Sequence, residues 1–502
     1  MNTEQTRVEN RDLAGYTPAD IPKVPERLSS KGLEPATRSP GFSWDASGVR
    51  HLLRRAAFAP NVEEVNAGVQ SDLDTLVNTL LAQRPAPSLL SWVNAPPFAP
   101  PLTTEQNQIY SQRRTELREW WIRLMLTQPL SVTEKMTLFW HGHFANEASI
   151  VRVPQYLFRQ NALFRQYAVG NFKELVKAVA IDPAMLIYLD GVRNRVGNPN
   201  ENFARELLEL FSIGIGNYTQ LDIQNAARAF TGWTVPATSL ESVFAPSRHD
   251  YGTKTFMGQT GNFDGNAIID IVFQQPATAM FICRKLYKYF VYEVPNETMV
   301  DQLAIIFRNS NYEIAPVLQT LLKSAHFFDP LNMGADISGP VERMVGAVRQ
   351  LGITVNPASD VVSRFIRRQS PALGQELLEP PNVAGWPGYR QWISATTLLL
   401  RNAFTDAIVK GRDINNTNIG FKVNPIAFAQ LFPNPNNAAG LVDDITAHLL
   451  ALPVSNSRRA MLLETLLAGI EPYDWNINDP LAGSRIEGLL KVIFRMAEYQ
   501  LE

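Results

Sequence analysis

The stretch NPNENFARELLELFSIG, residues 198–214, predicts one amphipathic helix with a clear start. Asn198 is placed to cap the helix, Pro199 to occupy its first position and Glu201 to complete a capping box. Apolar side chains then recur at the spacing of a single buried face, at Phe203, Leu207, Leu210 and Phe211. Because similar periodicity recurs along most of the chain, we expect helices to build the fold.

One segment breaks the helical pattern. Residues 233–265 are rich in glycine and aromatic side chains, and they predict a β-hairpin or an ordered loop near residues 243–265. The sequence therefore predicts a mainly α, multi-helix globular protein of two closely packed lobes with one small β element. We expect four parts: a flexible, proline-rich N-terminal arm over 1–42, an N-terminal helical lobe over 43–232, a β-hairpin or loop insertion over 233–267 and a C-terminal helical lobe over 268–502.

The composition disfavours several classes of protein. With 46 basic and 48 acidic side chains the formal net charge is −2, which gives no electrostatic reason to expect a nucleic-acid partner. The single cysteine, Cys283, excludes an intramolecular disulfide and a multi-cysteine metal site. The sequence has neither a signal-peptide pattern nor a long apolar run, so we expect a cytoplasmic protein without a membrane span. Walker, Rossmann, GxSxG and HExxH motifs are also absent from the sequence.

The segment FWHGHF, residues 139–144, places two of the six histidines one residue apart. Imidazole is a common ligand of zinc, iron and copper, and His141 and His143 can bind one ion if the helix ends at Gly142. On a regular helix the two side chains would instead point about 200° apart. In that alternative, one histidine is hydrogen-bonded in the core and the other caps the C-terminus of the helix.

Acidic and amide side chains form two rows on the helix that follows Pro199. Arg205 has an acid four residues away on each side, which is the spacing of ordinary surface ion pairs. Glu206, in a row with Asn202, lies beside the apolar stripe, where a carboxylate needs a cation, a metal or a raised pKa. We therefore place Glu206 with His141 and His143 in a candidate divalent-metal site.

The predicted β element carries a histidine beside an acid, at His249 and Asp250, with Lys254 close behind. One interpretation is a general base with an orienting carboxylate, although adjacent residues of a strand face opposite ways. The alternative is a turn that begins at Asp250, with Lys254 paired to a surface acid.

A second irregular segment, LEPPNVAGWPGYRQW at residues 378–392, is too rich in proline and glycine for regular structure. It carries Trp386 and Tyr389, and exposed aromatic side chains on a rigid loop present a stacking face to sugars or peptides. If the same side chains pack between helical lobes, they are structural staples.

A series of motifs resembles, in order and spacing, one bacterial family, the domain of unknown function 1800. The motifs are HLLRRAAFAP (51–60), FWHGHF, DPAMLIYLDG (182–191), NENFARELLELFSIG, YTQLDIQNAARAFTGW (218–233), HDYGTKTFMGQTGNFDG (249–265), RKLYKYFV (284–291) and PPNVAGWPGY (380–389). The resemblance is collinear from about residue 45 to the C-terminus. It implies a shared pocket that contains His141, His143, Asn202, Arg205, Glu206, Gly232, Trp233, His249, Asp250 and Lys254.

The resemblance implies little about activity, because the family has no established reaction. Its genes often neighbour those of a family that looks like alkaline phosphatases and sulfatases, which implies a partner protein of that type and a role in polymer metabolism. Our leading hypothesis is an enzyme, with a divalent metal as candidate cofactor, that acts on a glycan or other polymer. Its pocket would gather His141, His143, Glu206 and the His249–Asp250 pair. The alternatives are a non-catalytic binding or assembly protein and a small-molecule tailoring enzyme with a deep, apolar pocket.

Overall fold

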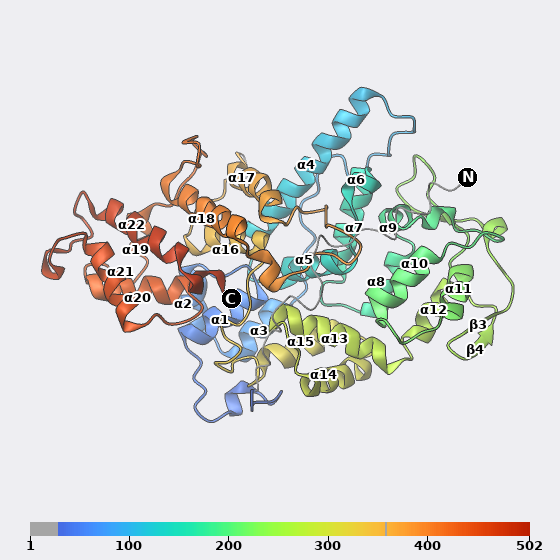
Figure 1. Ribbon diagram of the computed structural model, residues 1–502, viewed down its shortest axis with the longest axis horizontal. Helices are drawn as coiled ribbons and strands as arrows, with labels where there is room; N and C mark the ends of the chain where they lie inside the picture. The colour runs from blue at the N-terminus through green and yellow to red at the C-terminus, as the bar shows by residue number, and fades with distance from the viewer. Residues whose placement is uncertain (1–28, 357–358) are drawn as a thin grey trace.

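The computed structural model describes residues 29–356 and 359–502. Helices make up most of this part of the chain, which confirms the predicted mainly α class (Figure 1). Short 3-10 helices lie at Ala36–Arg38, Gly191–Arg193, Pro246–Arg248, Pro371–Leu373, Tyr389–Trp392, Pro472–Asp474 and Ala497–Gln500.

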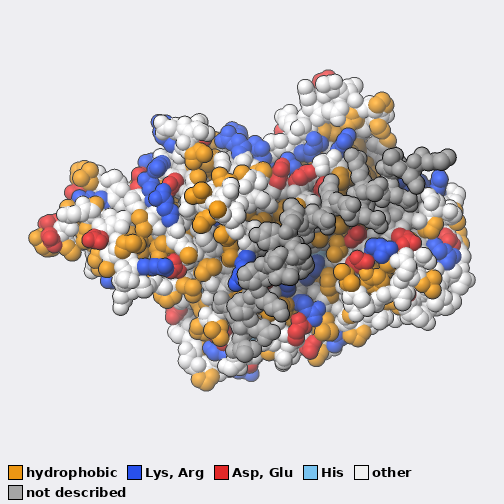
Figure 2. Space-filling view, in the orientation of Figure 1, with side chains coloured by type: hydrophobic (Ala, Val, Ile, Leu, Met, Phe, Trp, Pro, Cys, Tyr) orange, Lys and Arg blue, Asp and Glu red, His pale blue; other side chains and the backbone are white. Residues whose placement is uncertain are grey.

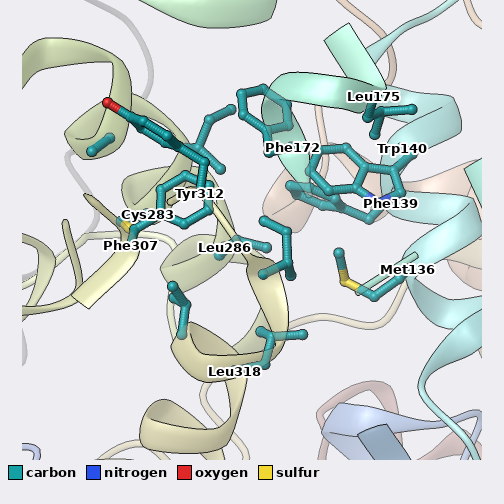
Figure 3. Close-up of a cluster of buried hydrophobic side chains, with 14 of the residues drawn as sticks. Met136, Phe139, Trp140, Phe172, Leu175, Cys283, Leu286, Phe307, Tyr312 and Leu318 are labelled. Carbon is teal, nitrogen blue, oxygen red and sulfur yellow. The ribbon is translucent and has the colours of Figure 1, made fainter. Parts of the chain in front are cut away.

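A first cluster of buried apolar side chains joins helices from the first two-thirds of the chain. Its helices are α1 (Ala46–Ala56), α2 (Val62–Gln70), α3 (Leu73–Leu81), α5 (Thr133–His143), α8 (Phe172–Ala180), α10 (Glu201–Glu206), α11 (Gln220–Ala229), α12 (Gly265–Val272), α13 (Pro276–Phe290), α14 (Glu297–Asn309) and α15 (Ile314–Lys323). Figure 3 shows part of this cluster, where the indole of Trp140 stacks on Phe172 with 5.4 Å between the ring centroids. Aromatic packing of this kind fixes α5 against α8.

A second cluster takes in Val62 of α2 and Leu138 of α5, and it joins later helices to three other helices that precede residue 170. These are α4 (Thr104–Thr127), α6 (Ala148–Val151), α7 (Pro154–Gln166), α16 (Pro340–Gln350), α17 (Val361–Gln369), α18 (Ala395–Lys410), α19 (Pro425–Ala429), α20 (Ala438–Leu449), α21 (Asn456–Leu467) and α22 (Ala482–Arg495). The short helix α9 (Pro183–Tyr188) contributes side chains to both clusters. The predicted lobe boundary near residue 232 stays a prediction. Both clusters of apolar side chains contain residues from before and from after this position.

Helix α5 lies between the two clusters. Met136 and Phe139 belong to the first cluster and Leu138 to the second, and Figure 1 shows α5 between the C-terminal helices on the left and α8 to α12 on the right. The helix that carries both histidines of FWHGHF is therefore enclosed on several sides.

The small β element is present within the predicted segment. Strand β3 (Lys254–Phe256) pairs antiparallel with β4 (Gln259–Gly261), as expected for residues 243–265. A second antiparallel pair, β1 (Trp233–Thr234) with β2 (Val243–Phe244), lies just before it. The structure thus has two short two-stranded sheets where the sequence predicted one hairpin.

The helix predicted over residues 199–212 differs from expectation at both ends. Its N-cap is Asn200, whose side chain accepts a hydrogen bond from the Asn202 amide, because Asn198 is engaged in a bridge with Arg195. After Glu206 the chain continues as a π-helix over Leu207–Ser212. A π-helix shifts the backbone hydrogen-bonding pattern from i→i+4 to i→i+5, and such turns occur often at functional sites.

Residues 1–28 of the predicted N-terminal arm lie outside the described residues. The part from residue 29 is bonded to the segment after α15: the Ala325 amide donates to the Glu34 carbonyl at 2.8 Å, and the His326 amide donates to the Gly32 carbonyl at 2.9 Å.

Basic and acidic side chains are interspersed on the face of the molecule in Figure 2. Among the described residues, the helices lack the combination of length and apolar character that crossing a membrane requires.

Candidate functional site

A pocket of about 350 Å³ lies between α5, α13, the segment around residues 336–342 and the proline–glycine loop, which we define as residues 378–392. Its lining combines aromatic side chains (Phe139, Tyr289, Trp386, Tyr389, Trp392), two lysines (Lys285, Lys288) and four acids (Glu293, Asp336, Glu342, Glu502). We treat it as the candidate functional site because charged groups with perturbed pKa values meet aromatic surface in one concave space.

His143 lies at the C-terminal end of α5, in the wall of this pocket. Its Nε2 atom is 3.0 Å from the carbonyl oxygen of Phe211, and its Nδ1 atom is 2.9 Å from Lys285 Nζ. A carbonyl oxygen only accepts, so Nε2 carries the proton and Nδ1 accepts a hydrogen bond from the lysine. Burial and the nearby Lys285 lower the pKa of His143 well below its ordinary value, so the imidazole stays neutral.

Lys285 joins the pocket to the π-helix. Besides His143, its ammonium donates to the carbonyl oxygen of Leu210 at 3.1 Å and lies 4.8 Å from the centroid of the Phe281 ring. Burial, together with the charge of Lys288, lowers the pKa of Lys285 to about 8. The π-helix thus supplies two successive carbonyl acceptors, from Leu210 and Phe211, to the pair of pocket side chains.

Three acidic residues of the pocket, Asp336, Glu342 and Glu502, form a second group of charged side chains. Glu342 forms an ion pair with Lys135, whose Nζ lies 2.6 Å from Oε1, and accepts a hydrogen bond from the Tyr289 hydroxyl at 2.9 Å. Arg55 lies 3.1 Å from Asp336 and 2.8 Å from Glu502. We call Arg55, Lys135, Asp336, Glu342 and Glu502 the carboxylate network.

Two members of the carboxylate network have pKa values displaced in opposite directions. Burial raises the pKa of Asp336 to about 6, and Arg55 only partly opposes this shift. Burial also acts to raise the pKa of Glu342, but attraction and hydrogen bonding by Lys135, with a hydrogen bond from Tyr289, lower it below its ordinary value. The pocket therefore contains one carboxyl group, that of Asp336, that keeps its proton to a higher pH than an ordinary aspartate, and one, that of Glu342, that stays ionised.

The proline–glycine loop is fastened to α5 by His141 and a close backbone approach. The Leu378 amide donates to His141 Nε2 at 3.0 Å, and the ring of Trp386 lies 5.3 Å from that of His141. Gly385 has a φ of +83°, and a Cβ atom there would overlap the carbonyl oxygen of Gly142. Burial, with a contribution from Arg118, lowers the pKa of His141 to about 3, so this histidine is also neutral.

The aromatic side chains of the loop match both sequence interpretations. Trp392 is buried, as a staple would be, whereas Trp386 and Tyr389 are half-buried and line the pocket. These two rings are therefore positioned both to pack against the protein and to contact a ligand.

The family model described as protein of unknown function (DUF1800) matches residues 51–501. The chain belongs to this family. The match confirms the resemblance that the motifs predict. No curated protein and no solved structure matches the chain.

In this DUF1800 protein the pocket is built largely from the family motifs. FWHGHF supplies Phe139, Gly142 and His143, RKLYKYFV supplies Lys285, Lys288 and Tyr289, and PPNVAGWPGY supplies the aromatic loop. Of the residues predicted for the shared pocket, the structure places His143 in the lining and His141 behind it, against Trp386. Trp386 and Tyr389, which were predicted separately as a stacking face, also line the pocket.

The predicted residues of α10 do not line this pocket. Asn202 is exposed, and Arg205 forms the expected helix-surface pairs with Glu201 at 3.2 Å and Glu209 at 3.6 Å. Glu206 is half-buried, and burial followed by repulsion from Glu209 raises its pKa.

The predicted residues of the β element form a separate cluster of contacts. His249 Nδ1 donates to the Thr231 carbonyl at 2.8 Å, and Asp250 pairs with Arg228 at 2.7 Å. Lys254 is buried and donates to the carbonyl oxygens of Asp250 and Gly252, rather than to a surface acid. The Gly252 amide donates to the Asp250 carboxylate, so a turn begins at Asp250, as the alternative to a catalytic pair predicts.

Trp233, the remaining predicted residue, packs on Phe244 across the β1–β2 pair. The β element and Glu206 therefore do not contribute to the lining of the pocket that contains His143. Within residues 29–356 and 359–502, no group of three or more His, Cys, Asp or Glu side chains is arranged to hold a metal ion.

Sequence reasoning missed Lys285 and the carboxylate network. Lys285, Lys288 and Tyr289 are spaced i, i+3 and i+4, so they share one helix face, and this was the available signal. No local signal could connect Arg55 with Asp336 and Glu502, which lie hundreds of residues away in the sequence.

Proposed function

We propose that this protein is an enzyme that cleaves a glycosidic bond in a glycan bound in the pocket. The observation that carries the proposal is that two carboxyl groups with oppositely displaced pKa values line the same pocket as Trp386 and Tyr389. Aromatic faces stack on the apolar faces of sugar rings, and carboxylates accept hydrogen bonds from sugar hydroxyls.

Glycosidases use two carboxyl groups in different protonation states. Asp336, with a pKa of about 6, is suited to protonate the leaving oxygen as general acid. Glu342, held ionised by Lys135, is suited to act as general base or nucleophile. Lys135 and the Tyr289 hydroxyl orient the Glu342 carboxylate through the contacts at 2.6 Å and 2.9 Å.

The proposal is tested by measuring the release of reducing ends from a panel of purified polysaccharides, both neutral and acidic. We expect Asp336→Asn and Glu342→Gln each to lower kcat by about 100-fold or more, with folding checked by thermal unfolding. Trp386→Ala should mainly raise KM, because it removes ground-state stacking. The matched control is Asp250→Asn, which breaks the ion pair with Arg228 outside the pocket.

If no polysaccharide is cleaved, or if the Asp336 and Glu342 variants cleave as fast as the wild type, the hydrolase proposal is wrong. The second candidate is then a non-catalytic glycan-binding protein. It is favoured by the ion pairs of the carboxylate network, because carboxylates tied to Arg55 and Lys135 can serve stability alone. A partner of the phosphatase or sulfatase type stays a prediction from the family resemblance.

A further inference from the structure

Almost every charged side chain that lines the pocket has a partner of opposite charge. Lys288 lies 3.0 Å from Glu293. The three acids of the carboxylate network are paired with Arg55 and Lys135 at 2.6–3.1 Å. The charges of Asp336, Glu342 and Glu502 are therefore each compensated by a basic partner, and the charge of Lys288 is compensated by Glu293.

Lys285 is the exception among the pocket residues that the structure describes. Its two hydrogen-bond partners, His143 Nδ1 and the carbonyl oxygen of Leu210, are uncharged. No carboxylate of the described residues lies within ion-pair distance of it. A partly buried ammonium without a counter-ion is unfavourable, so a ligand that brings negative charge to this position gains an ionic interaction.

The hydrogen bonds of Lys285 also leave room for such a ligand. An ammonium group has three N–H donors, and two of them go to His143 and Leu210. His143 cannot supply charge, because its Nε2 proton is given to Phe211 and its Nδ1 accepts from the lysine. One donor of Lys285 is therefore available to a group in the pocket that it lines.

We propose that Lys285 binds an anionic substituent of the sugar, a uronate carboxylate or a sulfate ester, and that the ligand of the pocket is an acidic glycan. The proposal rests on the proposed glycan-binding function and names the class of glycan. Trp386 and Tyr389 line the same pocket as Lys285 and provide the stacking surface, and the carboxylate network provides acceptors for the hydroxyl groups.

The test compares acidic oligosaccharides with neutral forms of the same backbone by titration calorimetry on the whole chain. The probes are glucuronate, galacturonate and mannuronate oligomers, each beside its methyl ester, and a sulfated galactose disaccharide beside its desulfated form. We expect at least one acid to bind about tenfold or more tightly than its neutral counterpart. The uronate and sulfate arms then identify which anion the site takes.

Variants assign the preference to Lys285. Lys285→Met should abolish the preference for the acid, and Lys285→Gln repeats the test if the methionine variant does not fold. Lys422→Met is the matched control, since Lys422 pairs with Glu487 at 3.4 Å outside the pocket lining, and it should keep the preference. Trp386→Ala should weaken acidic and neutral forms alike.

The proposal is overturned if no acid binds more tightly than its neutral form, or if the preference survives in both Lys285 variants. Failure of the hydrolase proposal gives a different result: Lys285-dependent binding of the acid without release of reducing ends.

Discussion

The Nε2 atom of His143 lies 3.0 Å from the carbonyl oxygen of Phe211, a contact between residues 68 positions apart. It connects the two segments FWHGHF and NENFARELLELFSIG, and it does so at the π-helix over Leu207–Ser212. His141, two residues earlier, instead accepts from the Leu378 amide. The two histidines of α5 therefore hold different parts of the chain, one the π-helix and the other the proline–glycine loop.

These contacts predict that the two neutral histidines carry their protons on different nitrogens. His141 should be protonated at Nδ1, because its Nε2 accepts, and His143 at Nε2, because that atom donates. Long-range ¹H–¹⁵N spectra of histidine-labelled protein at pH 7 and pH 5 check this, with His141→Gln and His143→Gln giving the assignments. Protonation of either ring at both nitrogens at pH 5 would contradict the structure, because burial keeps their pKa values lower.

Replacing Gly385 by alanine should detach the proline–glycine loop from α5. The new Cβ would overlap the carbonyl oxygen of Gly142, and the backbone φ of +83° adds strain, so we expect a loss of about 3 kcal/mol or more in the free energy of unfolding. Gly374→Ala is the matched control, since its φ of +91° and ψ of +8° are left-handed helical and the nearest atom to an added Cβ, in Trp392, lies 3.9 Å away. It should lose about 1–2 kcal/mol from backbone strain alone.

Urea unfolding followed by tryptophan fluorescence measures both glycine variants. Equal losses in the two would show that the contact between Gly385 and Gly142 does not fix the loop.

Arg55→Met should be strongly destabilising. It leaves the carboxylates of Asp336 and Glu502 mostly buried without their guanidinium partner, which typically costs about 3–5 kcal/mol. The control is Arg495→Met, which breaks the exposed pair with Asp406 and should cost about 1 kcal/mol or less. Thermal and urea unfolding of the two variants under one buffer condition decide between these outcomes. A loss from Arg55→Met no larger than that of the control would mean that water already solvates the network.

Stability should fall as the pH drops below about 6.5. Burial lowers the pKa of three histidines to about 3: His51, His141 and His448. It also lowers the pKa of His143 well below its ordinary value. The unfolded chain protonates them below pH 6.5, while the folded protein does not. Burial raises the pKa of Asp182 to about 7 and that of Asp336 to about 6, so these two bind protons in the folded state and oppose the effect.

For these six groups the unfolded chain binds about two more protons than the folded protein between about pH 4 and 6, so together they make the free energy of unfolding rise with pH by about 2.7 kcal/mol per unit there. Burial lowers the pKa of His326, which acts in the same direction, and raises the pKa values of Glu206 and Asp444, which act in the opposite direction. Urea unfolding at half-unit pH intervals measures the slope. In His448→Gln, which can still donate to the Gln350 carbonyl, the slope should be lower by about 1.4 kcal/mol per unit. A slope near zero, or the same slope in the variant, would contradict the assignment.

Much of the helical framework was predictable because its signals are local. The ion pairs of Arg205 with Glu201 and Glu209 appear as the four-residue spacing predicts. The start of the helix at Asn200 and its π-helical second half were not predictable, because the bridge of Asn198 to Arg195 and the bonds to His143 and Lys285 come from elsewhere in the chain.

The sequence by itself determined the mainly α class, the small β element and the family, because these depend on periodicity, capping and motifs within short stretches. It also drew attention to His143, Trp386 and Tyr389. Only the tertiary structure decided that these side chains meet Lys285 and three carboxylates in one pocket, while Glu206 and His249 lie outside its lining. The physical reason is that burial, charge pairing and hydrogen bonding depend on which distant segments pack together, and Arg55 meets Glu502 across nearly the whole length of the chain.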